Sequence, residues 1–203
     1  MSFTSNGSDI ARLRPDPTAV QRPAMPGSGV FINYRAEDSQ AAAALIDQAL
    51  TSCFGRDHVF LDSRSIPIGT DFTRELLARL RSSSVLLVVI GPRWLITADE
   101  AGRRRIDDPG DWTRLEIANA LRWGLRVVPV LLDGTVLPPT QLLPDDIAEL
   151  CHRQYLSLRL RHTEIDLRII ADRVAETDVG LATIAARRAF RCRCCGAATI
   201  KAS

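Results

Sequence analysis

The chain has 203 residues, of which 46% are hydrophobic, and this is enough for one core of ordinary domain size. No apolar run approaches the roughly 20 residues that cross a bilayer, and the N-terminus lacks a basic segment followed by an apolar one. We therefore expect a soluble, cytoplasmic protein without a membrane partner. The net charge of +2 conceals an asymmetry, because residues 30–179 hold 18 basic and 22 acidic residues, whereas residues 180–203 hold five basic residues and no acidic one. A solvated helix end explains this basic tail better than a nucleic-acid partner does.

The five cysteines are odd in number and scattered, which is not typical of a disulfide framework. Cys192, Cys194 and Cys195 fall within four residues, but they lack the paired spacing of a zinc site, and Cys151 and His152 are far away in the sequence. We expect a reducing compartment and no bound metal.

Composition divides the chain into three parts. Residues 1–28 are rich in Ser, Pro and Gly without an apolar period, so we expect a disordered leader, of which residues 1–26 can be deleted without loss of folding or activity. Residues 29–178 are expected to form one globular domain, and residues 179–203 a basic, cysteine-containing tail. Leu181, Ile184 and Ala185 in that tail have the spacing of a helix that could cover a sheet.

Short apolar runs of strand type alternate with segments of helical period. The expected strands are Val30–Tyr34, His58–Leu61, Val85–Ile90, Val127–Leu132 and Tyr155–Leu158. The expected helices are Ala42–Cys53, with Leu45 on its apolar face, a helix bearing Phe72, Leu76, Leu77 and Leu80, the helix after Asp111, and Glu164–Glu176. This alternation predicts a doubly wound α/β sheet of five parallel strands. Pro129 cannot donate to a ladder, so its strand should lie at or near an edge, or carry a bulge.

The helix after Asp111 is the most informative segment. Asp111 is a good N-cap and Gly124 a good C-terminal stop, which predicts a helix of about three turns. At helical spacing Glu116 falls beside Trp112 and Trp123, where its carboxylate would be partly desolvated. The alternative is a surface glutamate that Arg114 or Arg122 neutralises.

In doubly wound sheets ligands bind outside the carboxyl ends of the strands, near the switch in strand order. Those ends supply Asn33, Tyr34 and Arg35, then Asp62, then Gly91-Pro-Arg-Trp94 and Asp133. The helix of Glu116 also begins on that side, so we expect Glu116, Trp112, Tyr34, Arg35 and Asp62 around one crevice.

Common nucleotide-binding motifs are missing. No Gly-x-Gly-x-x-Gly follows a strand, and no Gly-x4-Gly-Lys-Ser/Thr occurs, which argues against a redox Rossmann enzyme and a P-loop NTPase. A response-regulator receiver needs an aspartate at the end of its third strand, where this chain has Gly91-Pro92.

Several ordered motifs resemble a bacterial Toll/interleukin receptor (TIR) domain from about Gly29 to Thr177. They are Val30-Phe-Ile-Asn-Tyr-Arg35, Phe60-Leu-Asp62 with the loop Ser63-Arg-Ser-Ile-Pro-Ile-Gly69, Gly91-Pro-Arg-Trp-Leu95, Asp111-Trp112-x-x-x-Glu116, and Val128-Pro-Val-Leu-Leu-Asp-Gly134. The resemblance implies a flavodoxin-like, doubly wound five-stranded parallel sheet. In catalytic members the glutamate of the Trp-x-x-x-Glu helix cleaves the nicotinamide–ribose bond of NAD⁺, and Glu116 holds that position here.

The resemblance therefore implies an NAD⁺ glycohydrolase, with cyclisation as a second outcome, acting in prokaryotic defence or stress signalling. NAD⁺ is then the substrate, and no cofactor is expected. A non-catalytic module that binds other TIR domains is the main alternative, and a nucleotide-sugar or deoxyribosyl transferase on a similar sheet is a weaker one. The product, linear or cyclic, stays open.

The remaining candidate residues have two interpretations each. Arg35 is a fork donor for the pyrophosphate or pairs with Glu37 or Asp38. Tyr34 and Trp112 stack on a substrate ring or pack against the fold. Asp62 binds ribose or caps a turn. The variable substrate contact of the family's long loop falls at Pro67, which has no side-chain donor.

The same loop is the expected assembly element. Ile66 and Ile68 flank Pro67, and Gly69 supplies a hinge, which suits a docking contact. In the resembling family this loop contacts a neighbouring TIR domain and helps to complete the active site. The expected partners are therefore other TIR domains in a homo-oligomer formed on activation, and whether a separate sensor protein exists stays open.

Overall fold

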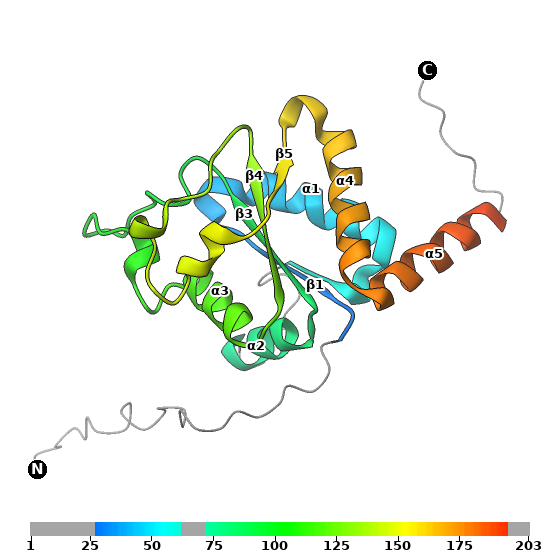
Figure 1. The fold of residues 1–203 in the computed structure, drawn as a ribbon, viewed down its shortest axis with the longest axis horizontal. Helices are drawn as coiled ribbons and strands as arrows, with labels where there is room; N and C mark the ends of the chain where they lie inside the picture. The colour runs from blue at the N-terminus through cyan, green and yellow to red at the C-terminus, as the bar shows by residue number, and fades with distance from the viewer. Residues whose placement is uncertain (1–26, 62–71, 195–203) are drawn as a thin grey trace, which may run out of the picture.

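The protein is described from a computed structural model, which covers residues 27–61 and 72–194. Five strands form one parallel sheet in the order β2-β1-β3-β4-β5 (Figure 1). The strands are β1 (Val30–Asn33), β2 (Val59–Leu61), β3 (Val85–Ile90), β4 (Arg126–Leu132) and β5 (Leu156–Leu158). A doubly wound sheet of five parallel strands was predicted from the alternation of strands and helices. Its strand order, with the switch in winding between β1 and β3, is the flavodoxin-like one that the family resemblance implied.

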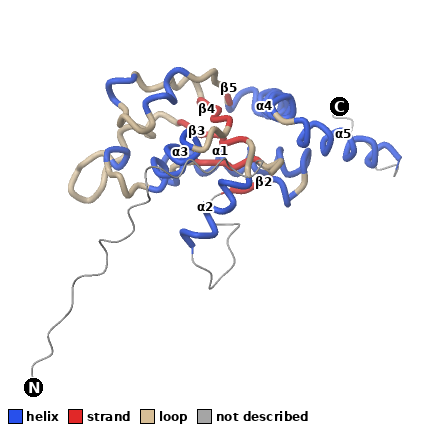
Figure 2. Tube along the Cα trace, turned by 60° about the horizontal axis from the view of Figure 1, so that its bottom comes forward, coloured by secondary structure: helices blue, strands red, loops and turns tan. Residues whose placement is uncertain are grey.

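Helices cover both faces of the sheet. They are α1 (Ala36–Phe54), α2 (Phe72–Ser82), α3 (Trp112–Arg122), α4 (Thr163–Thr177) and α5 (Val179–Cys194). Single 3-10 turns fill several connections: η2 (Arg56–His58), η4 (Arg105–Asp107), η5 (Thr140–Leu142), η6 (Ala148–His152) and η7 (Leu160–His162). In Figure 2 the strands lie between α2 and the pair α4 and α5.

The central strand β3 shows why the sheet needs two helical layers. All six of its residues are buried, as expected for an inner parallel strand. Val85, Leu87 and Val89 belong to a core formed with α1, α4 and α5. Leu86, Val88 and Ile90 belong to a second core formed with α2 and α3. The period of two along the strand therefore divides the protein into two apolar layers.

Pro129 is accommodated as the sequence predicted. Its strand, β4, is second from the edge, and Pro129 is opposite Val88 of β3. The edge strand β5 pairs with β4 only from Val130 onward. Pro129 therefore precedes the first residue of β4 that pairs with β5.

The helix predictions were correct in place, with corrections in detail. Helix α1 begins at Ala36 rather than Ala42, because its first turn is polar and carries Glu37 and Asp38 near the helix N-terminus, where negative charge is favourable. Leu45 is 36% exposed, so its assignment to the apolar face was wrong. It lines a groove between α1 and α4 together with Leu167, because α4 covers only part of α1.

Helix α5 extends the layer that covers the sheet. Leu181 is buried, and Ile184 and Ala185 pack against the core of α1 and α4. In the described parts of the chain, no helix is both long and apolar enough to cross a membrane.

Candidate functional site

Helix α3 is fixed at both ends by the residues that the sequence indicated. The carboxylate of Asp111 accepts a hydrogen bond of 3.1 Å from the backbone N–H of Arg114. At the other end Gly124 has a φ of +73°, and the N–H groups of Gly124 and Leu125 donate to carbonyls in the last turn. This is a Schellman-type ending, which favours glycine at the left-handed position. The helix therefore presents Glu116 from a defined start and register.

Glu116 is buried at the carboxyl end of β1, with 3% of its surface exposed. The side-chain amide of Asn33 donates to Oε2 of Glu116 at 2.6 Å and to the carbonyl of Thr113 at 3.2 Å. Asn33 is the last residue of β1 and is itself 1% exposed. One amide thus ties the end of a central strand to the middle of α3, next to the switch in strand order. The carboxylate is desolvated, as the sequence predicted, and it is not an exposed surface group. Arg114 pairs with Asp146.

Arg35 has a different partner from those expected. Its two terminal nitrogens donate to the two oxygens of Asp111, at 3.0 and 3.1 Å, and both side chains are 2% exposed. Glu37 pairs with Arg105 instead, and Asp38 accepts from backbone N–H groups, so the predicted pairing of Arg35 with Glu37 or Asp38 was wrong. Binding of a pyrophosphate by Arg35 would require this buried fork to open. In this structure Arg35 positions the start of α3.

A second arginine joins the same carboxylate. Arg105 lies 3.4 Å from Asp111 through Nε and 2.8 Å from Glu37 through Nη1. The long connection between β3 and α3 is thereby fastened to α1 and to the N-terminus of α3.

The first residues of the connection between β3 and α3 are hydrogen-bonded to Asp38 of α1. Its two carboxylate oxygens accept from the N–H groups of Gly91, at 2.9 Å, and of Arg93, at 2.7 Å. A Cβ at position 91 would come within 2.5 Å of the Asp38 carboxylate, so the close approach requires glycine. Trp94, further along, is buried in the core and does not face the crevice.

The aromatic candidates separate into different environments. Tyr34 is half-buried and packs against the core on the α1 face, opposite to the face that α3 covers. Trp112 is 37% exposed at the first position of α3. Trp123, at the far end of α3, packs against the α2 layer under the guanidinium of Arg81, at 5.6 Å. Trp112 therefore remains the aromatic candidate for substrate, whereas Tyr34 and Trp123 contribute to packing.

A hollow of about 460 Å³ lies at the same edge of the sheet, beyond β3 and β4. Its lining includes Gly91, Ile96, Asp133 and Val136, and Ile96 and Val136 are exposed. Asp133 has a φ of +44°, and its carboxylate accepts from the N–H of Leu160.

Several predicted residues lie outside the described residues. These are Asp62 and the loop positions Ile66, Pro67, Ile68 and Gly69, and also the side chains of Cys192, Cys194 and Cys195. Of the described cysteines, Cys53 and Cys151 are free thiols, and burial raises the pKa of Cys53. Among described residues, no three His, Cys, Asp or Glu side chains gather in a way that could hold a metal ion.

The sequence reasoning missed Asn33 as the partner of Glu116 and Asp111 as the partner of Arg35. A signal was available, because Asn33 is a polar residue that ends an apolar strand at the predicted crevice.

A family model described as "TIR domain" matches residues 30–170, which is most of the chain. The chain belongs to the TIR domain family. The matched residues include β1, α3 and Glu116.

Solved structures provide two further likenesses. The TIR domains of the activated Roq1 resistosome that directly recognises the pathogen effector XopQ share 19% identity and a TM-score of 0.43, with 78% of this chain and 84% of that chain covered. A metazoan TIR-STING receptor from C. gigas, in complex with 2′,3′-cGAMP, also shares 19% identity and a TM-score of 0.43, with 68% and 38% covered. A search of curated proteins finds no match.

Proposed function

We propose that this TIR domain is an NAD⁺ glycohydrolase in which Glu116 is the catalytic carboxylate. One observation carries the proposal: a buried carboxylate, held by Asn33, lies at the carboxyl end of β1 beside the switch in strand order. Burying a carboxylate costs free energy, and such a cost is characteristic of sites where charge is needed for chemistry.

The chemistry suits a single carboxylate. Nicotinamide in NAD⁺ is a pyridinium, so when the C1′–N bond breaks, the bonding electrons neutralise the ring nitrogen, and the leaving group needs no proton. Glycosidases, by contrast, use a second acid to protonate the leaving sugar oxygen. Positive charge develops at the ribose, and a fixed carboxylate in a desolvated site stabilises it. Water then adds to C1′ and releases a proton, giving ADP-ribose, whereas attack by a group of the same molecule gives a cyclic product.

The supporting residues have separate roles in this proposal. Asn33 orients the carboxylate of Glu116, and the Arg35–Asp111 pair fixes the start of α3. Trp112 supplies an exposed ring at that start, where a base or the nicotinamide could stack. Asp62 and the loop around Pro67 are proposed to complete the substrate contacts.

The decisive experiment is to incubate the purified protein with NAD⁺ and to resolve the products by chromatography. Glu116→Gln should lower kcat by about 100-fold or more, the size typical for loss of a group that stabilises transition-state charge, while the thermal midpoint changes little. Asn33→Ala should lower kcat by roughly tenfold, and Asn33→Ser, which keeps a hydroxyl donor, should recover part of the loss.

Glu164→Gln on the exposed first turn of α4 is the matched control and should leave turnover unchanged. Retained turnover in Glu116→Gln would remove Glu116 from the mechanism. A wild-type protein that consumes no NAD⁺ under any assembly condition would leave the interaction module as the function.

We further propose that assembly with other TIR domains activates the enzyme through the loop containing Ile66, Ile68 and Gly69. Specific activity should then rise with protein concentration over about a hundredfold range, in step with light scattering, because mass action favours the assembled state. Ile66→Asp should flatten this rise without lowering the thermal midpoint. A constant specific activity from a stable monomer would contradict the assembly step while leaving the role of Glu116 intact. Defence or stress signalling stays a prediction of the family resemblance, and whether a separate sensor protein exists stays open.

A further inference from the structure

A second cavity opens at the amino ends of the strands, which form the edge of the sheet opposite to Glu116. It has a volume of about 540 Å³ and is lined by the start of β4, the segment that leads into β5, and the last turn of α4. Small-molecule sites occupy roughly 300–1,000 Å³, so the cavity has room for a ligand of nucleotide size. Because the strands are parallel, their amino ends form this rim, and the cavity is separate from the site at the carboxyl ends.

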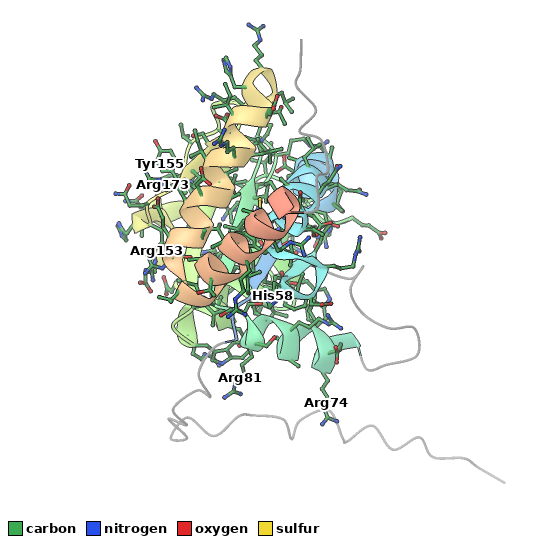
Figure 3. The ribbon with its side chains drawn as sticks, turned by 90° about the vertical axis from the view of Figure 1, so that its right-hand side faces the viewer. His58, Arg74, Arg81, Arg153, Tyr155 and Arg173 are labelled. Atoms are coloured by element: carbon green, nitrogen blue, oxygen red, sulfur yellow. The ribbon has the colours of Figure 1, made fainter. Side chains whose placement is uncertain are left out.

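Three arginines from three segments line the cavity: Arg126 of β4, Arg153 before β5, and Arg173 of α4. Arg153 and Arg173 are shown on one side of the molecule beside α4 (Figure 3). Among the described residues, the guanidinium of Arg126 makes no ion pair or hydrogen bond. Three guanidinium groups around one cavity, each able to donate two parallel hydrogen bonds, favour a phosphate group as the ligand.

The ion pairs that the other two arginines make are easily exchanged. Arg173 pairs with Glu176 at 2.9 Å, and both side chains are more than 60% exposed, at 63% and 62%. Arg153 pairs with Glu149, which is 60% exposed. Exposed pairs of this kind contribute little to stability, so an anionic ligand can replace them at small cost.

Arg153 also has an unused donor. Its Nε is closed off from solvent and has no hydrogen-bond acceptor among the described atoms. A buried donor without an acceptor is unfavourable, and rotation of this side chain towards an anion in the cavity would recover the missing bond.

An aromatic ring completes the rim. Tyr155 was expected to begin the fifth strand, but it precedes β5 and is 54% exposed, next to Arg153 and Arg173 in Figure 3. An exposed ring beside cations is a stacking platform for a base. Glu176, in the same lining, offers acceptors for ribose hydroxyls. A bare phosphate has no such donors, so its negative charge would only be repelled by this carboxylate and by the carbonyl groups at the end of α4.

We propose that this cavity binds a purine nucleoside monophosphate. The phosphate lies between Arg126, Arg153 and Arg173, the base stacks on Tyr155, and the ribose faces Glu176. Cations, an exposed ring and a carboxylate acceptor fit the three parts of one ligand, and none of them belongs to the site of Glu116.

The test is calorimetric titration of the full chain with AMP, beside titrations with inorganic phosphate and with adenosine. AMP should bind more tightly than either part alone. Arg126→Gln and Arg173→Gln should each weaken AMP binding by about tenfold, and Tyr155→Ala by a similar factor, because each removes one of three contacts. Arg168→Gln, an exposed arginine of α4 outside the cavity lining, is the matched control and should leave the affinity unchanged.

Trp112→Ala at the opposite edge separates the two sites and should also leave AMP binding unchanged. Loss of binding in Trp112→Ala, with retention in the arginine variants, would place AMP at the other edge and overturn the proposal. Absence of AMP binding to the wild type, or equal affinity for phosphate with no effect of Tyr155→Ala, would also overturn it. Circular dichroism of each variant checks that it is folded.

Discussion

Charged side chains have opposite roles at the two edges of the sheet, one formed by the carboxyl ends of the strands and the other by their amino ends. At the carboxyl edge Arg35, Asp111 and Glu116 are almost fully buried, and each contacts a fixed partner from another element. At the amino edge the pair Arg173 and Glu176 is more than 60% exposed, and both residues lie on one helix. A buried charge with a defined partner fixes geometry, whereas an exposed pair leaves its groups available to a ligand.

The largest expected effect comes from breaking the buried pair at the carboxyl edge. Arg35→Ala should lower the free energy of unfolding by about 3–5 kcal/mol, because the Asp111 carboxylate is left buried without its main counter-charge. Arg173→Ala at the amino edge should change it by less than about 0.5 kcal/mol. Urea unfolding of both variants, followed by circular dichroism, measures the contrast.

A double variant shows whether the pair or the packing is responsible. The double variant Arg35→Met with Asp111→Leu should recover most of the stability that Arg35→Ala loses. About 1 kcal/mol should stay lost, because Asp111 no longer provides the N-cap of α3. Equal losses for Arg35→Ala and Arg173→Ala would contradict the distinction between the edges.

The buried pair also shows what the sequence could not reveal. The ends of α3 were predictable from Asp111 and Gly124, because capping depends on residues close together in the chain. The five strands, and the doubly wound parallel sheet that they form, followed from local apolar patterns in the same way. The helix of Glu116 and its desolvation were therefore within reach of sequence reasoning.

The partners of Arg35 and Glu116 could not be predicted from the sequence, because they depend on which elements become neighbours in space. Arg35 lies 76 positions from Asp111, and Asn33 lies 83 positions from Glu116. From sequence alone, the nearby Glu37 and Asp38 were equally reasonable partners for Arg35. The strand order places β1 beside β3, and α3 over β1, and only this arrangement selects Asp111.

An intermediate effect is expected where α1 meets the connection after β3. Gly91→Ala should lower the free energy of unfolding by about 1–3 kcal/mol, because the new Cβ displaces the Asp38 carboxylate from the N–H groups of Gly91 and Arg93. Asp38→Ala should have an effect of similar size. If the clash is with Asp38, the double variant should be no less stable than Asp38→Ala alone, and a double-mutant cycle measures this. Additive losses would show that Gly91 is required for another reason.

The smallest expected effect concerns Asp166, a buried carboxylate on α4 that has a cationic partner. Asp166 of α4 accepts three hydrogen bonds from Arg159, of 2.7 to 2.9 Å, from the backbone N–H and from the guanidinium. The Arg159 guanidinium lowers the pKa of Asp166 from its ordinary 3.8 to about 2, although burial acts in the opposite direction.

Since the folded state lowers this pKa, the charged form of Asp166 stabilises the fold above the ordinary pKa, and its contribution is lost as the pH falls towards 2. Asp166→Asn should therefore have a thermal midpoint a few degrees below that of the wild type at pH 6, and the two midpoints should converge as the pH falls from about 4 to about 2. Glu164→Asn, on the exposed first turn of the same helix, should not reproduce this convergence. A midpoint difference for Asp166→Asn that stays constant down to pH 2 would mean that the shape of the side chain, rather than its charge, holds β5 to α4.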